Sequence, residues 1–325
     1  MVASGDNSNS FLPMTREELA ARGWEELDIL LISGDAYIDH PSFGVALLGR
    51  WLENHGYRVG IVAQPRWDTP EDVARLGRPR LFAGVTAGAL DSMLAHYTAF
   101  RKLRHDDAYT PGGKHGARPN RASIVYTNLV RQVFPGLPVV IGGIEASLRR
   151  ITHYDFWTDK MRRSLLLDSK ADLLVYGMAE RAILEIAQRL EHVPPQATAP
   201  AKALAGITGT CFAGRGGIPE GATVRTLVSH EAIADDPRLL METTLAMEHQ
   251  VHDGAWWAVQ AAGGRDIVVA PPAAPLTTRE LDNLYDLPFQ RSPHPLYRDP
   301  IPAATMIQFS VTSHRGCGGG CSFCS

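Results

Sequence analysis

The sequence has little cysteine, little net charge and no long apolar run. Four cysteines among 325 residues are too few for a disulfide framework. A formal net charge of -3 produces no global field for nucleic acid or anionic lipid. No apolar stretch approaches the roughly 20 residues of a membrane span, and the first residues lack the pattern of a secretory signal. The sequence therefore predicts a cytoplasmic protein without a membrane partner.

The remaining composition is that of an ordinary globular protein. Hydrophobic residues make up 45% of the chain and charged residues 21%, and the length favours more than one structural unit. Two basic pairs, Arg149-Arg150 and Arg162-Arg163, are the local exception to the balanced charge. They fit either a solvated face or a nucleic-acid contact. The balance as a whole argues against a nucleic-acid partner, without excluding one.

The first half of the chain alternates strands and helices. Thr15 and Glu18 have the spacing of a capping box, which predicts a helix over residues 15–23. The apolar run 27–33 is typical of a strand buried on both faces, and Ser42 is a candidate cap for the helix that follows. Further strands are predicted at residues 57–63, 81–86, 138–143 and 172–177.

This alternation predicts a Rossmann-like, doubly wound parallel sheet, an α/β fold, over residues 1–195. Ligands of such sheets bind outside the carboxyl ends of the strands. The loops at that edge span residues 34–42, 86–92, 142–150 and 177–180. In these loops, Asp39 and His40 are candidates for a site, although capping of the next helix explains them equally well. Gly142-Gly143 with Glu145 is a second candidate, for which a tight strand-to-helix turn is the equal alternative.

A Pro/Ala-rich linker at 194–205 separates this domain from a connecting α+β segment, residues 196–302, which contains a second, Pro-rich linker at 286–302. The stretch 104–121, with its Gly-Gly turn and several basic residues, predicts a mobile or functional loop. Cys211 stands alone and is expected to be a core thiol. Gly214-Arg-Gly-Gly217 does not complete a dinucleotide-binding fingerprint and is expected to be a loop. Residues 305–311 predict a last strand, which leads into a cysteine loop.

That loop holds Cys317, Cys321 and Cys324 in a C-x3-C-x2-C spacing. Structural zinc normally takes four ligands, and the nearest further candidate is His314. Three thiolates can instead bind three irons of a cubane cluster and leave the fourth iron open. The glycines around the cysteines permit the backbone angles that a loop wrapped round a cluster needs. Zinc and iron–sulfur both remain open on these grounds.

The strand, the C-x3-C-x2-C spacing and Phe323 before the third cysteine resemble the opening of a radical S-adenosylmethionine enzyme. Longer stretches resemble the YgiQ-type members of that superfamily. They include GGIEASLRRITHYDFWTDKMRR, LYDLPFQRSPHPLY and RGCGGGCSFCS. The likeness runs from about Phe11 to Ser325. We therefore identify the chain as resembling the N-terminal portion of a YgiQ-type protein.

The resemblance implies a [4Fe–4S] cluster held by the three cysteines, S-adenosylmethionine bound at the open iron, and Phe323 beside its adenine. It implies reductive cleavage to a 5′-deoxyadenosyl radical, an unknown substrate, and an electron donor such as flavodoxin or ferredoxin. It also implies that residues 303–325 begin a (β/α) barrel that is truncated here, so that this chain alone is expected to be inactive.

Two further expectations accompany this interpretation. The N-terminal domain resembles the cobalamin-binding domains of other radical enzymes, but their D-x-H-x-x-G pattern is not matched, because Asp39 and His40 are adjacent. Cobalamin is therefore not expected as a cofactor of this domain. The alternative function is a non-catalytic module that binds a ligand or partner and holds zinc or an electron-transfer cluster in its cysteine loop.

Overall fold

The computed structural model describes residues 10–194, 197–312 and 315. The chain forms two compact units, and each is described by itself below. The first unit comprises Met1–Leu137 with Leu276–His314, and the second comprises Pro138–Pro275 with Arg315–Ser325. This division differs from the boundaries expected after residues 195 and 302, which remain predictions about the domains of the whole protein.

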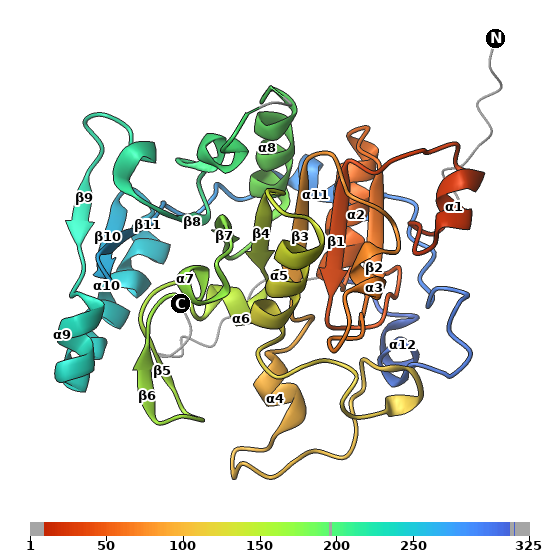
Figure 1. Ribbon diagram of the computed structural model, residues 1–325, viewed down its shortest axis with the longest axis horizontal. Coiled ribbons are helices and arrows are strands. Elements are labelled where there is room, and N and C mark those ends of the chain that lie inside the picture. Colours follow the sequence, from red (N-terminus) through yellow and green to blue (C-terminus); the bar gives the residue numbers. More distant parts are fainter. Residues whose placement is uncertain (1–9, 195–196, 313–314, 316–325) are drawn as a thin grey trace. The chain divides into compact units, whose positions relative to one another are not determined.

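The first unit is built on three parallel strands, β1 (Ile29–Ser33), β2 (Val59–Ala63) and β3 (Phe82–Thr86). Their order is β2-β1-β3 (Figure 1), with Ile29 opposite both Val59 and Phe82. Every residue of β1 and β2 is buried, which confirms the strands predicted from apolar runs. Burial on both faces explains why these strands show no alternation of polar and apolar residues.

Two helices of the first unit begin with capping boxes, and the first of these was predicted. Thr15 and Glu18 form a capping box at α1, and Thr277 forms one with Glu280 at α11. The prediction that Ser42 caps α2 is wrong, because Phe43 is the N-cap and the Ser42 backbone N donates to His40 Nδ1 at 3.1 Å. The helical segments are α1 (Arg16–Ala21), α2 (Gly44–Asn54), α3 (Glu71–Ala74), α4 (Ser92–His96), the 3-10 turn Pro111–Gly113, α5 (Ala122–Val133), α11 (Thr278–Tyr285) and α12 (Pro302–Ile307).

The Pro-rich segment after α11 is an integral part of the first unit. The His294 backbone N donates to Tyr37 O at 3.1 Å, and the Tyr37 backbone N donates to Tyr297 Oη at 2.8 Å. Ile301 joins a buried cluster that also holds Leu12. A stretch that the sequence suggested was a connector therefore closes the core of the N-terminal sheet.

The strand expected over residues 305–311 is not present. The chain there forms α12, Pro302–Ile307, with proline in the first turn, where a missing N–H costs no hydrogen bond. Phe309 and Val311 are 91% and 85% exposed. A lone strand is not stable without partner strands, and the described residues offer none here. The first strand of a barrel is thus corrected to a short helix in this chain.

The second unit has a mixed sheet in the order β4-β7-β8-β11-β10-β9. β4 pairs with β7, and β10 with β9, in parallel, whereas β7–β8, β8–β11 and β11–β10 are antiparallel. Within residues 1–195, the pairings β1–β2, β1–β3 and β4–β7 are all parallel, as expected, and the antiparallel strands β8 and β11 lie beyond that range. The strands of the mixed sheet are β4 (Val139–Gly142), β7 (Leu173–Val175), β8 (Thr210–Ala213), β9 (Val224–Thr226), β10 (Trp257–Ala262) and β11 (Arg265–Val269).

Short helices and one hairpin complete the second unit (Figure 1). Helix α8 buries Ile183, Ile186, Ala187 and Leu190, whose i, i+3, i+4, i+7 spacing places them on one face. The segments are α6 (Ile144–Ser147), the hairpin β5 (His153–Asp155) and β6 (Lys160–Arg162), α7 (Leu165–Ser169), α8 (Glu180–Glu191), α9 (His230–Asp235), α10 (Leu240–Asp253), and 3-10 turns at Pro200–Leu204, Arg215–Gly217 and Pro237–Leu239. Among all described helices, none has the length and apolar character needed to cross a membrane.

Candidate functional site

The predicted cluster ligands Cys317, Cys321 and Cys324, with Phe323 and His314, lie outside the described residues. Cys211 is described, and it is fully buried on β8, as expected of a core thiol. Burial raises the pKa of its thiol to about 12, so it is not a reactive thiolate. Within residues 10–194 and 197–312, no group of three His, Cys, Asp or Glu side chains is placed to hold a metal ion.

Arg315 is the described residue next to the cysteine motif, two positions before Cys317. Its guanidinium forms an ion pair with Glu180, whose side chain is only 2% exposed, and lies 3.0 Å from Met178 Sδ. Both partners belong to the segment that follows β7. Arg315 is therefore held at the carboxyl end of β7, one of the edges that the sequence marked for ligand binding.

The neighbouring strand β4 ends at the same edge of the second unit. Gly143 has φ 84° and ψ -175°, a conformation open to glycine alone, as it turns the chain into α6. The Gly177 backbone N donates to Ser147 Oγ at 3.4 Å, which joins the two loops. Glu145 is buried. The loops 142–150 and 177–180 thus lie together beside Arg315.

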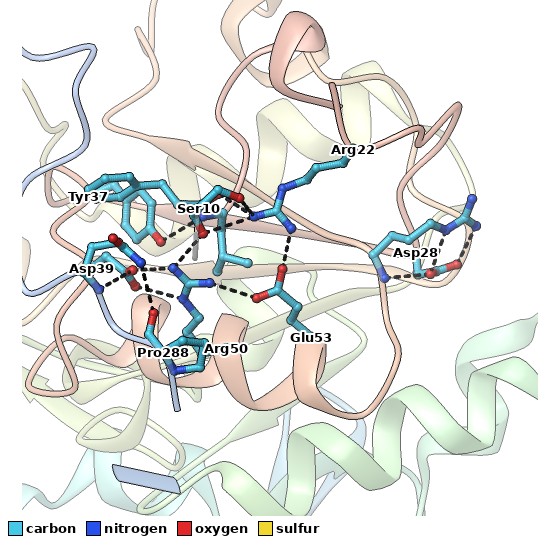
Figure 2. Close-up of polar contacts among 12 residues, drawn as sticks. Ser10, Arg22, Asp28, Tyr37, Asp39, Arg50, Glu53 and Pro288 are labelled. Atoms are coloured by element: carbon cyan, nitrogen blue, oxygen red, sulfur yellow. Dashed lines mark hydrogen bonds and ion pairs between the residues drawn. The ribbon is translucent and has the colours of Figure 1, made fainter. Parts of the chain in front are cut away.

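In the first unit, Asp39 is an interior ion-pair partner. Figure 2 shows the Arg50 guanidinium between Asp39 and Glu53. Arg50 Nε donates to Asp39 Oδ1 at 3.2 Å, Arg50 Nη1 lies 3.0 Å from Glu53 Oε2, and the Asp39 and Arg50 side chains are both fully buried. The Gln290 backbone N donates to Asp39 Oδ2 at 3.0 Å. Asp39 therefore ties the loop after β1 to the Pro-rich segment.

His40, next to Asp39, is buried too. Its Nδ1 accepts from Ser42, and its Nε2 has no hydrogen-bond partner among the described residues. Burial, and the positive charge of Arg291, lower the pKa of this imidazole, so it is neutral at pH 7. Its observed contact is with the turn into α2, the local role that the sequence analysis weighed against a site.

A second buried charge cluster, which no sequence pattern indicated as a whole, joins the loops after β1 and β3. Arg118 Nε donates to Asp107 Oδ2 at 3.0 Å, and Arg118 Nη2 lies 2.8 Å from Asp35 Oδ1. All three side chains are at most 4% exposed. Arg118 Nη1 also donates to Ala87 O at 2.9 Å. The stretch 104–121, expected to be mobile or functional, thus supplies two residues of the core.

This cluster holds two carboxylates against one guanidinium. Desolvation raises the pKa of Asp35 to about 6; Arg118 opposes this shift, and the negative charge of Asp107 adds to it. A Cβ at Gly88, where φ is 107°, would lie 2.2 Å from Asp35 Oδ1, so the backbone packs directly on the carboxyl group. The sequence offered one signal for this cluster, namely that Asp35 comes just after a buried strand. No sequence pattern pointed to Arg118, which lies 83 positions further along the chain.

The basic pairs singled out in the sequence have protein partners. Arg162 and Arg163 both bind Asp168, at 2.9 and 2.7 Å. Arg150 is buried, with its guanidinium 5.0 Å from the centre of the Tyr176 ring. These three cations serve the packing of the second unit.

Comparison with known proteins identifies one matching family model and several similar relatives. A family model described as "Radical SAM N-terminal" matches residues 11–310. A UPF0313 protein of Geobacter sulfurreducens is 56% identical over 317 residues, which cover 97% of this chain and 52% of that relative. UPF0313 proteins of Bradyrhizobium diazoefficiens and Thermotoga maritima are 49% and 50% identical, again over 97% of this chain and over 49% and 55% of theirs.

The chain therefore spans about half the length of the curated relatives it matches. The match nevertheless includes residues of both structural units, from Phe11, ahead of α1, to Ser310, after α12. The chain belongs to the Radical SAM N-terminal family.

Proposed function

We propose that the whole protein containing this chain is a radical S-adenosylmethionine enzyme of the YgiQ type, acting on a substrate still to be identified. The observation that carries the proposal is the C-x3-C-x2-C motif, with Phe323 before its third cysteine, in a chain that matches the family over residues 11–310. The relatives of about twice this length leave room for a following catalytic domain.

The donor set fits a [4Fe–4S] cluster. Cys317, Cys321 and Cys324 would supply three thiolates and leave one iron for S-adenosylmethionine. When bound, such a cluster supplies the electron that cleaves S-adenosylmethionine to methionine and a 5′-deoxyadenosyl radical, with an external donor such as a flavodoxin or ferredoxin. Phe323 would lie beside the adenine.

The described residues contribute positioning. Glu180 is held at the start of α8 and binds Arg315, so the chain reaches the cysteine motif from a fixed point. When a segment that carries metal ligands is already held in place, less conformational entropy is lost as the metal site forms.

The proposal is tested on the whole protein by anaerobic reconstitution with iron and sulfide. We expect about four irons per chain, an EPR signal of the reduced cluster that changes on addition of S-adenosylmethionine, and formation of 5′-deoxyadenosine. Cys321→Ala should abolish the S-adenosylmethionine-dependent signal and the product. Cys211→Ala, the matched control in the core of β8, should retain both.

Two results would reject the proposal. The first is zinc as the bound metal, which would favour the non-catalytic module. The second is a cluster whose EPR signal ignores S-adenosylmethionine and that forms no 5′-deoxyadenosine, which would favour an electron-transfer site.

The Arg315 anchor makes a separate prediction. Glu180→Gln removes the charge that holds Arg315, and losing a buried charged hydrogen bond costs about 1–3 kcal/mol. Trypsin should then cleave after Arg315 about tenfold faster in the protein without cluster. Glu185→Gln, which breaks the half-exposed Glu185–Arg189 pair on the same helix, should leave the rate unchanged. Equal rates for the wild type and Glu180→Gln would mean that Arg315 is not anchored there.

A further inference from the structure

The second unit contains a cavity of about 590 Å³ that no step above uses. It lies where β8 ends and where β7 and β11 begin, since Leu174 is opposite Cys211 and Ile267 is opposite Ala213. Glu180 follows the other end of β7, so the cavity and the Arg315 anchor lie at opposite edges of the same sheet. The volume falls within the roughly 300–1,000 Å³ of small-molecule sites.

The lining of the cavity combines an apolar floor with small side chains. Leu166, Leu167 and Phe212 are buried beneath it. The walls are mostly alanine and glycine, which leaves space that larger side chains would fill. These small lining residues are Ala171, Ala201, Ala205, Ala213, Gly214 and Gly216.

Three cations stand around this space, on three separate segments: Lys170 after α7, Lys202 in the 3-10 turn Pro200–Leu204, and Arg265 at the start of β11. Within the described part of the chain, Lys202 and Arg265 have no ion-pair partner. The nearby Arg215, by contrast, binds Asp266 at 2.6 Å. Two of the three cations are therefore available to an anion.

The single acidic residue of the lining does not cancel this charge. Asp172 accepts a hydrogen bond from the Val139 backbone N at 2.7 Å, so its carboxylate already serves the start of β4. The lining thus carries three cations and one carboxylate, and Lys202 and Arg265 are the cations without an ion-pair partner among the described residues. A multiply charged anion gains most from such an arrangement.

The glycine loop that failed the dinucleotide fingerprint forms one wall. Gly214 has φ 87°, a conformation that favours glycine. A Cβ at Gly217 would lie 2.5 Å from Gly206 N, so only glycine fits that contact, whereas one at Gly216 would meet nothing within 4 Å. The backbone at Gly216 is therefore exposed beside the cations, with no side chain to cover it. Exposed backbone N–H groups of this kind can approach a phosphate closely.

From this juxtaposition we propose that the cavity binds a phosphate-bearing ligand with an apolar body. The phosphates lie between Lys202 and Arg265, and the apolar part rests on the floor formed by Leu166 and Phe212. The site is separate from the cysteine motif, and it stands or falls independently of the radical chemistry proposed above.

Isothermal titration calorimetry on the whole protein at low salt tests this, with pyrophosphate and ATP as probes. We expect both to bind, with ATP at least tenfold tighter because only ATP covers the apolar floor. Lys202→Glu or Arg265→Glu should each weaken both probes at least tenfold. Arg238→Glu, which reverses an exposed arginine of the same unit, should change neither affinity by more than about twofold.

The proposal would be overturned if pyrophosphate, ATP or both failed to bind. So would binding that Lys202→Glu and Arg265→Glu leave intact, because the phosphates would then lie elsewhere. Pyrophosphate binding as tightly as ATP would remove the apolar body from the proposal and overturn it as stated. None of these results bears on cluster assembly, which iron content and EPR report separately.

Discussion

Replacing Arg118 by alanine is expected to destabilise the first unit by about 3–5 kcal/mol, because it leaves Asp35 and Asp107 buried without their shared cation. The loss of the Arg118 bond to Ala87 O adds to this. The measurement is amide hydrogen exchange in β1, Ile29–Ser33, in the whole protein, where protection reports the free energy of opening of this unit.

Arg66→Ala is the matched control, since it breaks an exposed ion pair with Asp72 in the same unit. It should cost less than about 1 kcal/mol. If Arg118→Ala lowered protection in β1 no more than Arg66→Ala does, the three charged side chains would not form the interior network described here.

The second large effect is a dependence of stability on pH. The pKa of Asp35 rises from 3.8 to about 6 on folding, mainly through desolvation. The folded state therefore prefers the protonated acid. The contribution of Asp35 to stability is complete below pH 3.8 and is lost as pH rises through 6. A shift of about 2 pH units corresponds to roughly 3 kcal/mol.

Hydrogen exchange in β1 between pH 4 and pH 7 measures this loss, after correction for the intrinsic exchange rates. Asp35→Asn, which stays neutral, should flatten the dependence over that range. Asp299→Asn, at the exposed pair with Lys114, should leave it in place. If Asp35→Asn kept the same dependence of β1 protection on pH, Asp35 would not be the source of that dependence.

Asp28 acts in a different pH range. Arg58 and Arg80 lower the pKa of its carboxyl to about 2, so its contribution to stability is lost as pH falls from 3.8 through 2.

Local sequence patterns predicted the elements whose cause is local. The apolar runs of β1, β2 and β3, the stripe on α8 and the capping boxes of α1 and α11 all follow from periodicity and side-chain chemistry within a few residues. The cysteine motif is local in the same sense, so the spacing of the predicted cluster ligands was evident from the sequence, although these residues lie outside the described part of the chain.

Beyond residue 195, the direction of the strands could not be obtained in this way. β8 and β11 look like the parallel strands when taken singly, yet both run antiparallel to their neighbours, because pairing depends on partners distant in sequence. β10 was missed, and residues 305–311 were assigned to a strand for which the described chain supplies no neighbour. A strand exists only with a partner, whereas a helix closes its hydrogen bonds within itself.

By itself, the sequence supplied the cysteine spacing and Phe323 on which the proposed chemistry rests, since both are readable without a fold. Tertiary structure alone decided which charges became interior. Asp35 and Arg118 are 83 positions apart, Asp39 meets the backbone of Gln290, and Arg315 meets Glu180. It also gathered Lys170, Lys202 and Arg265 around one cavity. The physical reason is that burial and Coulomb interaction depend on distance in space, which no local pattern encodes.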